Sequence, residues 1–121
     1  MSDIGFVLLY VESVDRSCAF YEAILGRAAI ESSPTFAMLP AAPGVMLGLW
    51  RRDGVEPTAT TPGGAEIAIS AGSEEAVKAT HDEWRGRGVA IAQPPTQMDF
   101  GFTFVALDPD GHRIRVFRPQ G

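Results

Sequence analysis

Few residues in this sequence have the chemistry of a catalyst. Cys18 is the single cysteine, and His81 and His112 are the two histidines. A cysteine nucleophile needs a base beside it, and His81 could serve only if the two helices that carry these residues met. We therefore interpret Cys18 as a small core residue, His81 as a partly exposed helix residue and His112 as a hairpin residue. No catalytic residue is assigned.

Sequence motifs for catalysis or phosphate binding do not occur. The chain has no Gly-x-Ser-x-Gly elbow, no Gly-rich loop followed by Lys-Ser or Lys-Thr, no dinucleotide fingerprint and no HExxH pair. Asp108 and Asp110 are spaced as in a calcium loop, but the rest of the twelve-residue pattern is missing. The segment from Asp108 to Gly111 is therefore predicted to be a tight turn.

Composition narrows the class of protein. With 121 residues, of which 45% are hydrophobic and 21% charged, the chain can form a globular core. A net charge of −5 without a run of Lys or Arg argues against a nucleic-acid partner. A single cysteine favours a reducing compartment. Because no apolar run reaches the roughly 18 residues of a membrane span and no signal-peptide pattern is present, we expect a cytoplasmic protein without a membrane partner.

Hydrophobic periodicity in the first part of the chain predicts a strand, a helix and three strands. The apolar run 4–11 suits a central strand buried on both faces. Residues 13–25 have helical spacing, with Ser13 as the N-cap and Gly26 after the last turn. Residues 40–44, rich in proline and alanine, are predicted to be a turn. The three short strands are expected around residues 28–32, 35–39 and 45–51.

The second part repeats this order. Residues 65–71 alternate as a strand, and Ser73 can cap a helix that ends at Gly86 and Gly88. One face of this helix carries Val77, Thr80, His81 and Trp84. A break is expected at Pro94-Pro95. The strands of this part are predicted near residues 89–92, 102–107 and 113–118.

The repeat predicts an α+β fold built from two βαβββ modules. The first module covers residues 1–51, a Pro- and Gly-containing linker covers residues 52–63, and the second module covers residues 64–121, all within a single structural domain. One module of about 55 residues leaves one side of its sheet uncovered. We therefore expect the two modules to form a curved mixed sheet around a central trough, with the helices on the outer faces and a ligand in the trough.

Two segments resemble the vicinal-oxygen-chelate superfamily, which contains glyoxalase I, extradiol dioxygenases, fosfomycin-resistance proteins and bleomycin-binding proteins. One runs from Leu9 to Gly26 and includes Ser17-Cys18-Ala19-Phe20-Tyr21; the other runs from Phe104 to Phe117 and includes the Asp-Pro-Asp-Gly turn. The resemblance implies a homodimer. Three shorter segments are similar to a subgroup related to phenazine-antibiotic resistance proteins: residues 33–38, 47–50 and 98–101.

The resemblance also locates a possible metal site. In the superfamily's metalloenzymes, His and Glu residues on the first and last strands of each half hold a cation, and these positions align with Phe6, Gly48, Glu66 and Arg115. Only Glu66 could bind a metal, and the guanidinium of Arg115 opposes it. We therefore expect no metal and no other cofactor. Glu66 and Arg115 either form a salt bridge in place of the metal or recognise polar groups of a ligand, and both can hold together.

The candidate ligand-binding residues are those expected to line the trough. They are Phe6, Phe36, Met46, Gly48, Trp50, Glu66, Met98, Phe100 and Arg115, with Tyr10, Phe102 and Phe117 nearby. Because side chains alternate along a strand, Met46 and Trp50 share the face of Gly48, which should leave room beside them. The segment 98–101 has no counterpart in the first half and is expected to fold over the trough. Aromatic rings favour a flat ligand, although the same rings could simply be core.

The leading hypothesis is metal-independent binding and sequestration of a small planar aromatic compound, an antibiotic or a phenazine-like metabolite, by a protein that is not an enzyme. Two alternatives stay open. The chain could be a glyoxalase-like lyase or isomerase, or a dioxygenase, with Glu66 as base or metal ligand. It could also be an oligomeric interaction module whose trough is filled.

Overall fold

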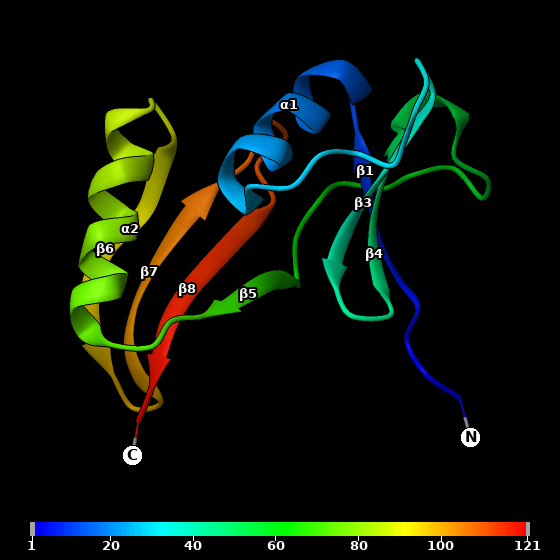
Figure 1. Cartoon of the computed structure of the whole chain (residues 1–121). Coiled ribbons are helices and arrows are strands. Elements are labelled where there is room, and N and C mark those ends of the chain that lie inside the picture. Colours follow the sequence, from blue (N-terminus) through cyan, green and yellow to red (C-terminus); the bar gives the residue numbers. More distant parts are fainter. Residues whose placement is uncertain (1, 121) are drawn as a thin grey trace. The chain divides into compact units, whose positions relative to one another are not determined.

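The computed structural model describes residues 2–120 and divides into two compact units, with the boundary between Thr61 and Pro62. Each unit contains one helix and one four-stranded mixed sheet in the order βαβββ (Figure 1). This arrangement confirms the predicted α+β fold of two βαβββ modules.

Unit 1 has the sheet order β1-β4-β3-β2, in which β1 and β4 are parallel and the other pairs antiparallel. Its elements are β1 (Phe6–Val11), α1 (Val14–Leu25), β2 (Glu31–Ser32), β3 (Phe36–Ala42), β4 (Val45–Arg51) and the 3-10 turn η1 (Arg52–Gly54).

The ends of α1 follow the predicted caps. The Ser13 hydroxyl accepts a hydrogen bond from the backbone N–H of Arg16 at 3.2 Å. Gly26 adopts φ 66°, a conformation that suits glycine, and its N–H donates to the carbonyl of Glu22. Cys18 lies on the buried face of the helix, and burial raises the pKa of its thiol. This location confirms its interpretation as a core residue.

Three predictions about unit 1 are wrong in detail. The strand β1 lies at an edge of its sheet, and Phe6 and Leu8 are 50% and 44% exposed, so it is not a central strand buried on both faces. The strand β3 continues through Pro40 with an irregular register up to Ala42, because a bulge tolerates a residue without an N–H. Only the two residues before Val45 remain as the turn, and β2 is much shorter than expected.

Unit 2 has the same topology, with the sheet order β5-β8-β7-β6 and with β5 parallel to β8. Its elements are β5 (Glu66–Ser70), α2 (Glu74–Gly86), β6 (Ala90–Met98), β7 (Gly101–Leu107) and β8 (Arg113–Pro119).

The helix α2 begins as predicted, because the Ser73 hydroxyl accepts a hydrogen bond from the N–H of Ala76 at 3.0 Å. His81 was expected to be partly exposed, but it is 9% exposed. It lies on the same stripe of the helix as Trp84, and both rings pack edge-on against Phe104, with centroids 5.3 and 5.5 Å away. His81 is therefore a core residue of unit 2.

The strand β6 does not end at the predicted proline break. It runs through Pro94 and Pro95 to Met98, with shifts of register between Ile91 and Gln93 and between Gln93 and Thr96. β6 is an edge strand, where a residue that cannot donate a ladder hydrogen bond is tolerated. Sequence pattern alone did not reveal this edge position.

The segment 98–101, which was expected to be a loop over the trough, is a tight hairpin turn. Met98 pairs in register with Gly101, so only Asp99 and Phe100 connect β6 to β7. The other predicted turn is confirmed: the Asp108 carboxylate accepts the N–H groups of Asp110 and His112 at 2.9 and 2.8 Å.

Between residues 2 and 120, no helix has the length and apolar character needed to cross a membrane.

Gly101 is the position where we expect the fold to tolerate a side chain least. Its φ of 148° is unfavourable for other residues, and an added Cβ would collide with the carbonyl oxygen of Arg118 on β8. We predict that Gly101→Ala lowers the free energy of unfolding by roughly 2–3 kcal/mol or more, measured by urea denaturation. Gly86→Ala, in α2 with open space around it, is the control and should be neutral or slightly stabilising. Equal stability of Gly101→Ala and wild type would contradict this geometry.

Candidate ligand-binding surfaces

The two units share a common frame, set by their helix caps and strand registers. Ser13 and Ser73 cap the equivalent helices, seven residues after Phe6 and Glu66 respectively. On the last strands, Gly48 pairs with Leu8 and Arg115 pairs with Ala68, two residues beyond Phe6 and Glu66. Phe6 and Glu66 are therefore equivalent, and so are Gly48 and Arg115.

In unit 1, the sheet face away from α1 carries three aromatic side chains in a row. Tyr10, Trp50 and Phe36 are register partners across β1, β4 and β3, and all three are half-buried. We call them the aromatic row. The Tyr10 and Trp50 rings meet edge to face, with centroids 6.1 Å apart. The intervening residues Ala37 and Leu49 are fully buried on the opposite face, toward α1.

Local hydrogen bonds hold the strand ends that carry this row. The Ser33 hydroxyl accepts the backbone N–H of Phe36 at 3.1 Å, and Arg51 N–H donates to the carbonyl of Thr35 at 2.9 Å. Beyond Trp50, the Arg51 guanidinium pairs with Asp53 at 2.7 Å at the start of η1. The row is thus positioned by turns at the ends of β3 and β4.

Gly48 does not leave open room, contrary to the sequence-based expectation. A Cβ at this position would lie 2.5 Å from Leu8 Cδ2 and 3.0 Å from Phe36 Cζ. The absent side chain instead lets Leu8 and Phe36 lie close on the sheet. Met46, half-buried, pairs with Phe6 at the other end of β4. The candidate residues of unit 1 therefore form an apolar surface whose middle is filled by its own side chains.

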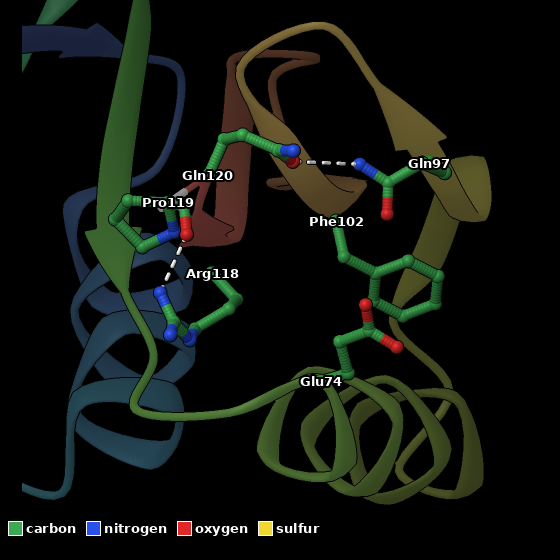
Figure 2. Close-up of a pocket in the computed structure, with 6 residues that line it drawn as sticks. All are labelled: Glu74, Gln97, Phe102, Arg118, Pro119 and Gln120. Carbon is green, nitrogen blue, oxygen red and sulfur yellow. Dashed lines mark hydrogen bonds between the residues drawn. The ribbon is translucent and has the colours of Figure 1, made fainter.

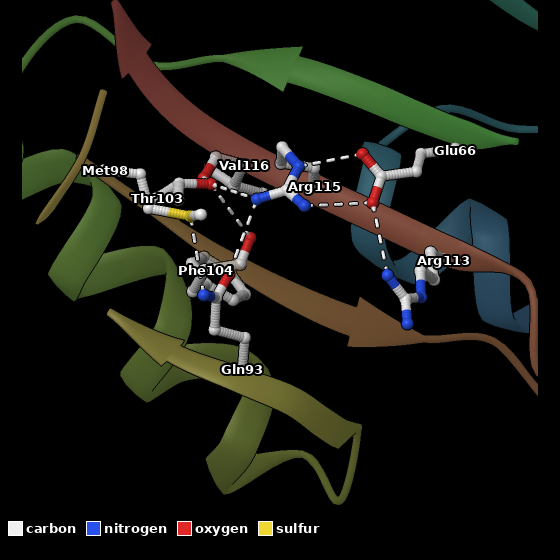
Figure 3. Close-up of polar contacts among 8 residues, drawn as sticks. All are labelled: Glu66, Gln93, Met98, Thr103, Phe104, Arg113, Arg115 and Val116. Carbon is white, nitrogen blue, oxygen red and sulfur yellow. Dashed lines mark hydrogen bonds and ion pairs between the residues drawn. The ribbon is translucent and has the colours of Figure 1, made fainter. Parts of the chain in front are cut away.

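In unit 2, the corresponding face carries an ion pair (Figure 3). Arg115 binds the Glu66 carboxylate with two hydrogen bonds, Nε to Oε1 at 2.8 Å and Nη2 to Oε2 at 3.0 Å. The hydrogen bond from Arg115 lowers the pKa of Glu66, against a smaller opposing effect of desolvation. Arg113 Nη1 lies 3.8 Å from Glu66 Oε2. The side chains of Arg115 and Glu66 are 17% and 30% exposed, so water screens this pair only partly.

Two residues that sequence reasoning did not identify also hold Arg115. Its Nη1 donates to the Thr103 hydroxyl at 3.2 Å and to the Gln93 side-chain oxygen at 3.4 Å. The Thr103 hydroxyl donates in turn to the carbonyl of Val116 at 3.0 Å. These contacts and the Glu66 pair occupy four of the five N–H donors of Arg115. The network depends on the β6–β7 register, which the sequence pattern did not predict.

The hairpin turn brings two further candidates to Arg115. The Phe100 ring lies 5.4 Å from the guanidinium carbon, and its edge packs against Phe117 at 6.1 Å. Met98 lies near Gln93, whose Nε2 is 3.5 Å from the Met98 sulfur. The structure thus gathers the candidate residues into two sets, an apolar one in unit 1 and a polar-aromatic one in unit 2.

The residues at the four superfamily metal positions do not fit a metal centre. Phe6 and Gly48 have no donor atoms in their side chains, and both carboxylate oxygens of Glu66 accept hydrogen bonds from Arg115. Within residues 2–120, no group of three or more His, Cys, Asp or Glu residues could hold a metal ion. The residues at these four positions therefore lack the donor set that Zn²⁺, Ni²⁺ or Mn²⁺ needs.

A cavity of about 210 Å³ lies elsewhere in unit 2 and contains none of the predicted ligand-binding residues (Figure 2). It is lined by Glu74, Gln97, Phe102, Arg118, Pro119 and Gln120. Phe102 was expected near the trough. It lies two residues before Phe104 on β7, so both side chains are on the face of the sheet that packs against α2. The cavity was missed because its residues are far apart in sequence and come together only through strand pairing.

Comparison with known proteins identifies the family. Residues 3–116 match the Glyoxalase/Bleomycin resistance protein/Dioxygenase superfamily, and the chain belongs to it. The chain is 33% identical over 112 residues to the phenazine antibiotic resistance protein EhpR of Enterobacter agglomerans, which covers 90% of this chain and 86% of that protein.

Solved structures agree with this assignment. A protein of Agrobacterium tumefaciens, determined in solution by NMR, is 45% identical over the whole of both chains, with a TM-score of 0.91. A glyoxalase-related enzyme of Fulvimarina pelagi has a TM-score of 0.86 at 20% identity, covering 98% of this chain and 88% of that one. The second likeness concerns the fold alone.

The Glu66–Arg115 pair predicts a pH-dependent stability. Because the folded-state pKa of Glu66 is lowered, its contribution is complete above the ordinary glutamate pKa of about 4.3 and is lost as pH falls through the lowered value. Glu66→Gln should cost roughly 1–2 kcal/mol at pH 7, and the difference from wild type should shrink below about pH 4. Urea denaturation between pH 3 and 7 measures both. Glu31→Gln, at an exposed strand position, is the control; a Glu66→Gln deficit that does not change with pH would contradict the ion-pair explanation.

Proposed function

We propose that this protein binds a small planar aromatic compound without a metal ion and acts by sequestering it. The observation that carries the proposal is the aromatic row of Tyr10, Trp50 and Phe36, three half-buried rings on the sheet face that α1 does not cover. Ring contacts add about 0.5–1.5 kcal/mol per pair beyond the burial of apolar area. Leu8 and Met46 beside the row offer further dispersion contacts.

The relationship to a resistance protein supports this class of ligand. EhpR is a phenazine antibiotic resistance protein, and it shares 33% of aligned residues with this chain. A phenazine is a flat, fused tricyclic aromatic, so a surface of rings is chemically suited to it. We therefore extend the proposal to a phenazine-like antibiotic or metabolite as the ligand, and to resistance by stoichiometric binding.

The two arginines on the polar face of unit 2 differ in how far they are already engaged. Arg115 is already committed to Glu66, Thr103 and Gln93, whereas Arg113 is 60% exposed and has only a 3.8 Å contact with Glu66. On this face of unit 2, Arg113 therefore has more capacity than Arg115 to bind a further acidic group. Arg115 then serves mainly to hold Glu66 and the Phe100 ring in place.

The enzyme alternative is less well supported by the same contacts. A general base works best when its pKa lies near the operating pH, and the pKa of Glu66 is lowered. Both of its oxygens are also engaged by Arg115. The other alternative is an oligomeric interaction module whose trough is filled. It gains support only at Gly48, where Leu8 and Phe36 occupy the space. Neither the engaged Glu66 carboxylate nor the filled space at Gly48 favours catalytic turnover over ligand binding.

We expect binding to depend on Trp50. In a Trp84→Phe background, which leaves Trp50 as the single tryptophan, phenazine-1-carboxylate should quench its fluorescence saturably. Trp50→Leu should weaken binding by about tenfold or more, measured by calorimetry, because a stacking partner is lost. Phe20→Leu, which removes a half-buried ring on α1, is the matched control and should bind like wild type.

Two results of binding experiments would contradict the proposal, and a third result, on stability, would do the same. One is an unchanged Trp50 signal with every planar aromatic tested, together with unchanged affinity in Trp50→Leu. The other is a requirement for metal: protein dialysed against EDTA should bind as well as untreated protein, and loss of binding that Zn²⁺, Ni²⁺ or Mn²⁺ restores would overturn metal independence. A Trp50→Leu variant destabilised by more than about 3 kcal/mol would assign this ring to the core instead.

We also propose that the protein is a cytoplasmic homodimer. The edge strand β1 exposes Phe6, Val7 and Leu8 by 50%, 39% and 44%. Exposed apolar edges are usually covered by pairing, and a two-fold dimer is the commonest way to do so. Sedimentation equilibrium should give twice the chain mass, and Leu8→Lys should shift it toward monomer; a wild-type monomer at every concentration would contradict this part of the proposal.

A further inference from the structure

The cavity in unit 2 lies between the first residue of α2 and the ends of three strands (Figure 2). Its floor is formed by Gln97, Phe102 and Arg118, which are register partners across β6, β7 and β8. Neighbouring strands lie about 4.8 Å apart, so the floor is about 10 Å wide. The cavity is therefore a feature of strand pairing and helix position, and not of a loop.

The helix α2 begins at Glu74, directly after its Ser73 cap, and covers only part of the sheet face on which Phe102 lies. The cavity lies where the helix leaves this face uncovered. Phe104 is fully buried beneath the helix, whereas Phe102, two residues earlier, is only half-buried. The Lys78 ammonium lies 5.5 Å from the centroid of the Phe102 ring. The exposed part of the Phe102 ring lines the cavity beside the start of the helix.

Opposite charges face this space from opposite sides. Figure 2 shows the Glu74 carboxylate on the helix side beside Phe102, and the Arg118 guanidinium across the cavity from it. Among residues 2–120, no ion pair joins the two groups, and Arg118 donates one hydrogen bond to the carbonyl of Pro119. The Gln97 amide, also part of the lining, donates to the Gln120 side-chain oxygen at 3.2 Å. A carboxylate and a guanidinium thus remain available to a molecule between them.

We propose that this cavity binds a small zwitterion, a free α-amino acid with a short apolar side chain. Its carboxylate would bind Arg118, its ammonium would bind Glu74, and its side chain would lie on the Phe102 ring. A molecule with a single charge would leave either Glu74 or Arg118 without a counter-charge. The cavity has a volume of about 210 Å³, and none of its lining residues belongs to the aromatic row. The site is therefore distinct from the aromatic row.

L-Leucine is the probe for this site. Titration of the ¹⁵N-labelled full chain should give saturable NMR shifts of the Gln97 and Gln120 side-chain amides and of Arg118 Nε, with a Kd on the order of 1 mM. Two analogues each lack one charge: 4-methylpentanoate has no ammonium, and 3-methylbutylamine has no carboxylate. Each should bind about tenfold more weakly than L-leucine.

Variants on two different elements make the test independent of one residue's effect on folding. Glu74→Gln and Arg118→Gln should each weaken L-leucine binding about tenfold, with dispersed spectra that show an intact fold. Glu75→Gln, the next acidic residue in the first turn of α2 and not part of the cavity lining, should bind like wild type. The proposal is overturned if L-leucine causes no saturable shift at roughly 20 mM, if the single-charge analogues bind equally well, or if Glu75→Gln weakens binding as much as Glu74→Gln.

Discussion

A single helix can cover only one face of a four-stranded sheet, and the rest of this structure depends on that constraint. In each unit the covered face is apolar and closely packed, with Leu39 and Leu49 under α1 and Phe104 and Val116 under α2. The uncovered faces differ in chemistry. Unit 1 carries rings and aliphatic side chains there, whereas unit 2 carries a hydrogen-bonded ion pair. The faces that the chain's own helices leave free are the ones on which we propose that a ligand binds.

The four superfamily metal positions show how the two faces differ. Phe6 and Glu66 are equivalent, and Gly48 and Arg115 are equivalent. In unit 2 the carboxylate of Glu66 is paired with the guanidinium of Arg115. In unit 1 Gly48 has no side chain, and Leu8 and Phe36 lie close to it on the sheet. The charge of Glu66 is therefore neutralised by a residue of its own unit.

Sequence reasoning succeeded where local chemistry determines structure. The Ser13 and Ser73 caps, the Asp108 turn and the βαβββ order follow from short-range signals, and all are confirmed. Sequence reasoning failed where the position of a strand in its sheet determines which residues the strand accepts. Proline is allowed in β6 only because that strand lies at an edge. The side chains around Arg115 and the cavity beside Glu74 depend on register between distant strands, which one-dimensional periodicity does not encode.

The central claim is that the aromatic row forms the surface on which a planar aromatic ligand stacks. Isotope-filtered NMR on labelled protein with unlabelled phenazine-1-carboxylate tests this most directly, because nuclear Overhauser effects report proton pairs in contact. We predict effects between the ligand's ring protons and the side chains of Trp50, Tyr10 and Phe36. Effects confined to residues outside this row, with none to Trp50, would contradict the account.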